Sequence, residues 1–178
     1  MKPDFKVKSL AVTFLLAGTL GATAQQLSIN KSTYNTAVGI RAGGTSGLTI
    51  KHFTSSGMAL EGIIGLNPYW GEGFNATLLY EKHVNAFQES GFNWYYGAGG
   101  HVTAYQRGTY FHRYRGERTY YYTDSEAGIG IDGIIGLEYK IKPIPIAISF
   151  DLKPFVEVNT AGFGFASLDP GLGIKLTF

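Results

Sequence analysis

The chain has 178 residues, with 15 Lys and Arg, 13 Asp and Glu, 25 Gly, 12 Tyr, 12 Phe and no Cys. The absence of Cys excludes disulfides, thiol catalysis and thiolate metal sites. The formal excess of two positive charges belongs to residues 1–24, which hold three Lys and one Asp. The charge therefore gives no argument for nucleic-acid binding.

The first 24 residues have the pattern of a cleaved secretory signal peptide. Three Lys precede an apolar stretch, Leu10–Leu20, and the small residues Ala22–Ala24 follow it. This stretch is shorter than the ~20 residues that a membrane-spanning helix needs. We predict cleavage before Gln25 and a single domain over residues 25–178.

Eight later segments alternate between apolar and polar or small residues, the period of a β-strand. They cover about residues 34–43, 47–53, 58–66, 74–84, 92–104, 127–141, 146–153 and 172–178. In the last segment the apolar side chains from Leu172 to Phe178 share one face, and Lys175 lies on the other. Only helices and closed barrels satisfy all backbone polar groups in lipid. The predicted fold is all-β, an eight-stranded antiparallel up-and-down transmembrane β-barrel.

The lengths of the predicted connections differ between the two ends of such a barrel. Outer-membrane barrels have short periplasmic turns and long external loops, with both chain ends in the periplasm. The connections predicted to be external are 44–46, 67–73, 106–126 and 154–168, and those predicted to be periplasmic are 54–57, 85–91 and 142–145. The three longest connections of the external set favour this orientation over a soluble barrel or sandwich, which does not need it.

Charged residues fall on the inward positions of the predicted strands. This predicted lumen charge network contains Arg41, Lys51, Glu61, Glu81, Asp132, Glu138, Lys140, Asp151, Lys153 and Lys175. Lys51 and Glu61 lie at similar distances from a turn, so we expect them to be cross-strand neighbours. Eight strands leave an interior just wide enough for side chains. A structural plug of ion pairs is the main interpretation, and an ion or proton path or a buried catalytic cluster are the alternatives.

The histidines do not form a predicted metal site. His83 and His101 both face inward on neighbouring strands, but eight residues of strand at ~3.3 Å each place them on the order of 25 Å apart. His52 and His112 add no ligand spacing. We predict no catalytic residue, no metal and no cofactor from any local motif.

The segment 107–126 is unusually rich in aromatic and basic residues. We predict external contacts for Tyr110, Phe111, Arg113, Tyr114, Arg115, Arg118, Tyr120, Tyr121 and Tyr122. Aromatic rings suit protein or glycan contact, and Arg suits the phosphates of lipopolysaccharide. An aromatic belt at the headgroup level below a solvated hairpin is the equal alternative.

Several segments resemble small outer-membrane β-barrel proteins of Gram-negative bacteria, of the OmpA/OmpX-like kind. They are residues 39–41, 47–53, 79–83, 94–101, 136–139 and 149–154. A last strand that ends in Phe178 resembles the C-terminal sorting signal of such barrels. The resemblance, which covers nearly all of residues 34–178, implies an outer-membrane location, contact with lipid and lipopolysaccharide, and recognition by the barrel-assembly machinery. It brings no catalytic motif, and the His-x-Ser pattern of a lipid A deacylase is absent from the sequence.

The resulting hypothesis is an integral outer-membrane protein with a structural or surface-adhesion role through its external loops. One alternative is a surface enzyme that modifies lipid A, using polar residues near the external rim such as His101 or Asp124. The other alternative is a narrow pathway for ions or protons.

Overall fold

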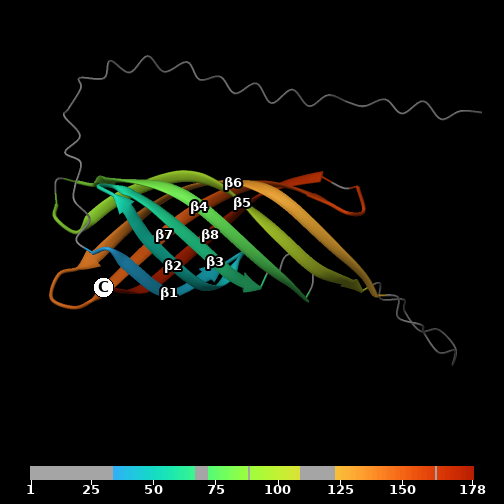
Figure 1. The fold of residues 1–178 in the computed structure, drawn as a ribbon, viewed down its shortest axis with the longest axis horizontal. Helices are drawn as coiled ribbons and strands as arrows, with labels where there is room; N and C mark the ends of the chain where they lie inside the picture. Colours follow the sequence, from blue (N-terminus) through green and yellow to red (C-terminus); the bar gives the residue numbers. More distant parts are fainter. Residues whose placement is uncertain (1–33, 67–71, 88, 109–122, 163) are drawn as a thin grey trace, which may run out of the picture.

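The strands close into a single antiparallel barrel in which each strand pairs with its neighbours in the sequence (Figure 1). The computed structural model describes residues 34–66, 72–87, 89–108, 123–162 and 164–178. The strands are β1 (Thr36–Gly43), β2 (Ser46–Ser55), β3 (Met58–Leu66), β4 (Glu72–Asn85), β5 (Phe92–Gly108), β6 (Thr123–Ile141), β7 (Ile146–Asn159) and β8 (Gly164–Thr177). β1 pairs with both β2 and β8, which closes the barrel. The predicted eight-stranded antiparallel up-and-down fold is confirmed.

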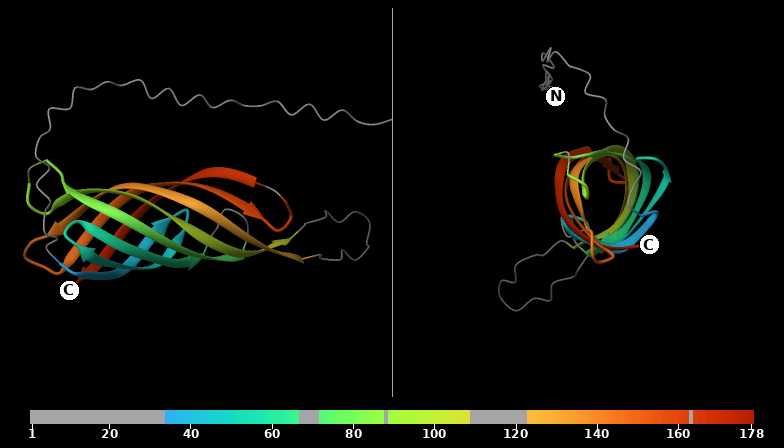
Figure 2. Two further views of the ribbon diagram at one scale, coloured as in Figure 1. Left: turned by 45° about the horizontal axis from the view of Figure 1, so that its top comes forward. Right: turned by 90° about the vertical axis from the view of Figure 1, so that its left-hand side faces the viewer.

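The first strand begins and the last strand ends at the same end of the barrel, which we call the turn end. The backbone of Phe178 bonds to Thr36, with 2.8 Å from the Phe178 nitrogen to the Thr36 oxygen. The short connections 56–57, 86–91 and 142–145 lie at this end, on the left in Figure 1. At the opposite end, which we call the far end, β1, β3, β5 and β7 end and β2, β4, β6 and β8 begin. The end-on view in Figure 2 shows the strands closing around an oval cross-section.

The last two strands are longer than the alternation predicted. β7 continues from Lys153 to Asn159, and β8 begins at Gly164 rather than at residue 172. The predicted connection 154–168 therefore shrinks to residues 160–163. Pro154 and Pro170 lie just outside the two predicted segments, and proline lacks the N–H that a strand ladder uses. Each proline removes only one donor, and the pairing of Leu152 with Pro170 and of Pro154 with Leu168 continues past both.

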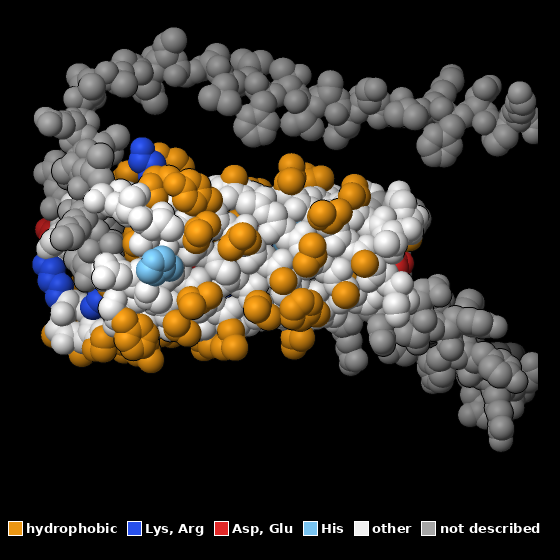
Figure 3. Space-filling view, in the orientation of Figure 1, with side chains coloured by type: hydrophobic (Ala, Val, Ile, Leu, Met, Phe, Trp, Pro, Cys, Tyr) orange, Lys and Arg blue, Asp and Glu red, His pale blue; other side chains and the backbone are white. Residues whose placement is uncertain are grey.

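The outer face of the barrel is apolar. Ile40, Leu78 and Ile131 are 58%, 60% and 71% exposed, although each lies in the middle of a strand. Hydrophobic side chains are spread over the visible wall in Figure 3, and charged side chains gather at its two ends. On the described mid-strand positions, Asp and Glu face inward only. No helix among the described residues is long and apolar enough to span a membrane.

Glycine opens room for the large side chains of the inner face. A Cβ added at Gly136 would overlap the ring of Tyr95, and one added at Gly130 would overlap the ring of His101. The register pairs these residues directly, Tyr95 with Gly136 and His101 with Gly130. Each bulky group thus lies over the backbone of the neighbouring strand, which lets the barrel interior fill without widening.

Candidate functional site in the barrel interior

The polar side chains of the interior form two clusters along the barrel axis. The Lys51 cluster, nearer the turn end, contains Lys51, Glu61, Glu81, Glu138 and Lys175. The Arg41 cluster, nearer the far end, contains Arg41, His101, Asp132, Asp151, Lys153, Glu157 and Asp169. Alternation along every strand brings these residues to the same interior, because inward positions recur at every second residue.

Lys51 is shared by three carboxylates. Its Nζ lies 2.8 Å from Glu61 Oε2, 2.8 Å from Glu81 Oε2 and 3.5 Å from Glu138 Oε2. The register pairs Lys51 directly with Glu61, as predicted from the turn. Lys175 holds the other oxygen of Glu61 at 2.9 Å. Because the ammonium is fully buried, these carboxylates replace the water it loses.

Aromatic rings close the turn end below the Lys51 cluster. The rings of Tyr34 and Phe53 have centroids 5.1 Å apart, those of Phe53 and His83 4.8 Å, and those of His83 and Tyr95 5.1 Å. Tyr34 Oη donates to Glu138 at 2.5 Å, and Lys51 Nζ lies 4.2 Å from the centroid of the Tyr95 ring. The stack therefore shields the lysine and carboxylates from the turn end.

Arg41 anchors the second cluster through both edges of its guanidinium. Its Nη2 lies 2.6 Å from Asp151 Oδ1, and its Nη1 lies 3.1 Å from Asp169 Oδ2. Nη1 also donates to the carbonyl of Thr45 at 2.7 Å, in the connection after β1. The planar fork of arginine fixes two carboxylates and one loop in a single geometry.

His101 and Lys153 extend the Arg41 cluster toward the far end. Lys153 Nζ lies 2.9 Å from Asp132 Oδ1 and 3.4 Å from Asp169 Oδ2. His101 Nδ1 lies 2.7 Å from Asp132, and its Nε2 lies 3.0 Å from Glu157. An imidazole with a carboxylate at each nitrogen donates to both only as the imidazolium. His101 therefore has no ring nitrogen left to serve as a general base.

Tyr95 joins the two clusters. Its ring covers Lys51, and its hydroxyl donates to Asp151 Oδ2 at 3.2 Å. Tyr95, Lys51 and Lys153 are among the largest fully buried side chains of the described chain. At this level of the barrel an ion would have to separate buried pairs to pass, which is the property expected of a plug rather than of an open pore.

The structure places nine of the ten residues of the predicted lumen charge network in ion pairs. Lys140 differs from the prediction. Its Nζ donates to the carbonyls of Ile141 and Ile144 at 2.9 and 2.7 Å, because it lies beside the turn 142–145, beyond the reach of the clusters.

Two members of the Arg41 cluster, Glu157 and Asp169, were not predicted from the sequence. Both are fully buried and inward, on the parts of β7 and β8 that were predicted to be a loop. The alternation Lys153, Phe155, Glu157 continues past Pro154 and could have identified the first. The alternation of β8, followed backward from Gly171 past Pro170, could have identified Asp169.

The two inward histidines lie at different levels, as predicted, but the offset is six residues rather than the eight expected. The register places His83 opposite Tyr95 and His101 opposite Thr77, so six residues of β4 separate the two levels. Among the described residues no group of three or more His, Cys, Asp or Glu is arranged to hold a metal ion. The side chain of Asp124 lies outside the described part.

The predicted external contacts lie outside the described residues. These are Tyr110, Phe111, Arg113, Tyr114, Arg115, Arg118, Tyr120, Tyr121 and Tyr122. The same holds for the predicted signal peptide, residues 1–24. Phe178, the predicted assembly signal, follows β8 with its side chain 73% exposed.

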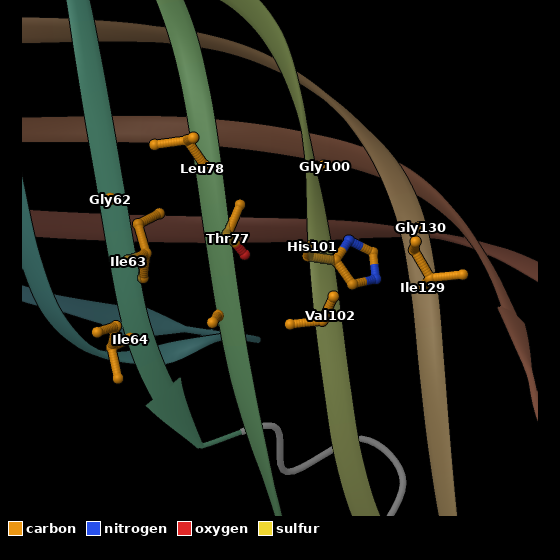
Figure 4. A pocket seen from close by; sticks show the side chains of 11 residues that line it. Gly62, Ile63, Ile64, Thr77, Leu78, Gly100, His101, Val102, Ile129 and Gly130 are labelled. Carbon is orange, nitrogen blue, oxygen red and sulfur yellow. The ribbon is translucent and has the colours of Figure 1, made fainter.

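A hollow in the barrel wall runs across β3, β4, β5 and β6 (Figure 4). Small residues, Gly62, Ala76 and Gly100, lie between larger apolar ones. Its polar side chains are Thr77, which donates to Asn75, and His101, which is held by its two carboxylates. The hollow therefore presents no reactive group.

The comparison with solved structures gives one informative match. The N-terminal β-barrel domain of OprF from Pseudomonas aeruginosa superposes with a TM-score of 0.54, covering 80% of this chain and 95% of that chain at 15% identity. The fold is that of a small eight-stranded outer-membrane barrel. No protein-family model and no curated protein matches the chain. At this identity the likeness speaks for the fold alone, and it confirms the OmpA/OmpX-like resemblance at that level.

Proposed function

We propose that the chain is an integral outer-membrane protein of a Gram-negative bacterium, with a structural or surface-interaction role and a lumen closed by buried ion pairs. The observation that carries the proposal is that apolar side chains lie on the outside of the barrel and charged side chains on the inside. Ile131 is 71% exposed on the outside of β6, while its neighbour Asp132 is 4% exposed inside. A protein surrounded by water gains nothing from this arrangement, whereas lipid solvates the apolar face.

The outer face supports a membrane location because its described mid-strand positions carry no charge, and the outward Lys82 lies near the turn end of β4. A Lys or Arg on the lipid face of a barrel costs about 2–4 kcal/mol at the bilayer midplane. The described strands place their mid-strand Asp and Glu inside, where Lys51, Arg41 and Lys153 neutralise them. The signal-peptide pattern of residues 1–24 supports export across the inner membrane.

The interior supports a closed lumen rather than a conductance pathway. Lys51 is held by three carboxylates and covered by Tyr95, and Arg41 is held by two more. Removing one partner of a buried ion pair costs several kcal/mol, so spontaneous separation of these pairs would be rare.

The interaction role rests on the composition of the connection between β5 and β6. Aromatic and Arg residues of the segment 110–122 suit contact with lipopolysaccharide, an extracellular protein or a glycan. Replacing 110–122 by a Gly/Ser segment of equal length is expected to abolish binding of purified lipopolysaccharide or adhesion to a glycan panel. Heat-dependent mobility in gels, a readout of barrel folding, is expected to stay unchanged. Adhesion equal to the parent protein would contradict the loop assignment.

Cell fractionation with surface proteolysis tests the membrane location and orientation together. The protein is expected in the outer-membrane fraction, with cleavage in intact cells confined to residues 106–126. Cleavage at the turns 86–91 or 142–145 in intact cells, or recovery in the soluble fraction, would overturn the proposal. Lipid A extracted from expressing cells is expected to be unmodified, and altered acylation would favour the enzyme alternative.

A further inference from the structure

A single cation lies on the outer wall of the barrel, near the turn end. Lys82 of β4 is exposed and faces outward, and no other Lys, Arg, Asp or Glu does so among the strand residues whose side chains the structure describes. Its cross-strand neighbours are Met58 and Tyr96, so no carboxylate lies opposite it. On a wall that faces lipid, such an ammonium reaches either water or the phosphate of a lipid headgroup.

Exposed aromatic side chains surround Lys82. Tyr80 precedes it by one outward position on β4, Tyr96 lies directly opposite on β5, and Trp94 is the next outward residue of β5 toward the turn end. Tyr and Trp gather at the two membrane interfaces, where an apolar ring meets polar headgroups. The aromatic neighbours therefore place the Lys82 ammonium at the depth of lipid phosphates.

The hollow across β3, β4, β5 and β6 lies on the far-end side of this level (Figure 4). Beyond Tyr96, the next outward residues of β5 are the small Ala98 and Gly100, and Gly100 lines the hollow. All outward residues of its lining are apolar or Gly, and its volume is about 460 Å³. This volume lies within the ~300–1,000 Å³ of small-molecule sites, and the lining suits an acyl chain.

The spacing between Lys82 and the hollow fits one leaflet of a membrane. Ala76, which lines the hollow, precedes Lys82 by six residues of β4, or ~20 Å of strand at ~3.3 Å per residue. Strands of such barrels tilt by about 35–45°, so this length spans about 15 Å along the membrane normal. The hydrocarbon core of a bilayer is ~30 Å thick, so the hollow reaches to about its middle.

We propose that the outer wall over β3–β6 binds one anionic phospholipid, with its phosphate on Lys82 and one acyl chain in the hollow. The inference rests on the proposed membrane location, and the proposed orientation makes the leaflet periplasmic. The charge of Lys82 favours a lipid with net negative charge, such as phosphatidylglycerol. A second copy of the chain fits less well, because the described outer wall has no Asp or Glu to set against Lys82.

Quenching of Trp94 fluorescence by brominated phospholipids tests the proposal, because Trp94 lies beside Lys82. The chain has two Trp, and Trp70→Phe leaves Trp94 as the single reporter. The full-length mature protein with this change is refolded in phosphatidylcholine vesicles that contain a small share of brominated phosphatidylglycerol or of brominated phosphatidylcholine. We expect about fivefold preferential binding of the phosphatidylglycerol, the contribution of one Lys at a membrane surface, and a smaller preference in high KCl. Equal quenching by the two lipids, or a preference that KCl leaves unchanged, overturns the proposal.

Lys82→Gln tests the headgroup contact. It is expected to remove the preference for phosphatidylglycerol, and Lys82→Arg is expected to keep it because the charge remains. Lys142→Gln is the matched control, since it removes an exposed Lys of the turn 142–145 and is expected to keep the preference. Equal losses in Lys82→Gln and Lys142→Gln would refute the site, because they would show a general attraction of charge to the membrane.

Ala76→Leu tests the acyl chain, because the larger side chain fills the hollow from β4. It is expected to weaken binding of phosphatidylglycerol about twofold through lost packing contacts. Ala42→Leu, on the outward face of β1 and outside the hollow, is the matched control and is expected to bind as the parent does. Equal binding by these two variants would refute the placement of the chain. A cross-linked dimer that Ala76→Leu abolishes would assign the hollow to a second copy and overturn the proposal.

Two further readouts separate the alternatives. Potassium phosphate is expected to displace the lipid no better than KCl at equal ionic strength, and stronger displacement would assign Lys82 to free phosphate and overturn the proposal. Heat-dependent gel mobility reports folding, and Lys82→Ala replaces Lys82→Gln if the latter does not fold. A parent protein that does not insert into vesicles would contradict the proposed membrane location, whereas an inserted parent without lipid preference contradicts this inference alone.

Discussion

The two clusters inside the barrel neutralise their buried carboxylates in different ways. In the Lys51 cluster one flexible ammonium is shared by three Glu and sealed by aromatic rings. In the Arg41 cluster a rigid guanidinium, a lysine and a histidine each bridge a pair of carboxylates. In the first, only Lys51 contacts all three Glu, and Lys175 adds a contact to Glu61 alone, while the second distributes its charge over three cations. The turn end is therefore the more sensitive half, and the far end tolerates rearrangement near its mouth.

The largest effect is expected from Lys51→Met, which keeps the side-chain volume and removes the shared charge. Three buried Glu lose a partner, and we expect a loss of about 3–5 kcal/mol in the free energy of unfolding by urea in lipid vesicles. Lys153→Met is the comparison in the other half. Asp169 keeps Arg41 and Asp132 keeps His101, so its loss is expected to be smaller. Equal losses would contradict the contrast between the clusters.

Arg41→Lys tests the rigid fork without changing charge. A lysine cannot hold Asp151, Asp169 and the Thr45 carbonyl together, since it is a point charge on a flexible stem. We expect a loss of about 1–3 kcal/mol from charge-assisted hydrogen bonds, measured in the same urea unfolding. The control is Lys142→Arg in an exposed turn, which is expected to be neutral. A neutral Arg41→Lys would mean that charge alone organises this half.

The smallest effect is expected from Tyr95→Phe, which removes the hydroxyl that joins the clusters and keeps the ring over Lys51. The loss in unfolding free energy is expected to be about 1 kcal/mol, the typical net worth of one hydrogen bond. In a double-mutant cycle this loss is expected to couple to Arg41→Lys, because both act on Asp151, and to add independently to a change at Lys175. Coupling to neither would show that the clusters are separate.

The sequence predicted the fold more completely than it predicted the contacts between side chains inside the barrel. Alternation identified all eight strands, because a period of two is a local property of a wall with one apolar face. The turn between β2 and β3 also predicted the Lys51–Glu61 pair. The contacts of Lys175 with Glu61 and of Tyr34 with Glu138 were beyond prediction, since they cross the lumen and depend on how the strands are staggered around the closed barrel.

Part of the interior was also not predicted. The end of β7 and the start of β8, which contain Pro154 and Pro170, were predicted to be a loop, so Glu157 and Asp169 were left out of the predicted network. Their inclusion changes the charge of the far half from balanced to acidic.

Single-channel recording of the refolded wild-type protein in planar bilayers tests the central claim, that buried ion pairs hold the lumen closed. The account predicts conductance no greater than that of protein-free membranes. Long-lived open channels in the wild-type protein would contradict it, because ions would then cross a level of the barrel that Lys51, Tyr95 and Arg41 fill.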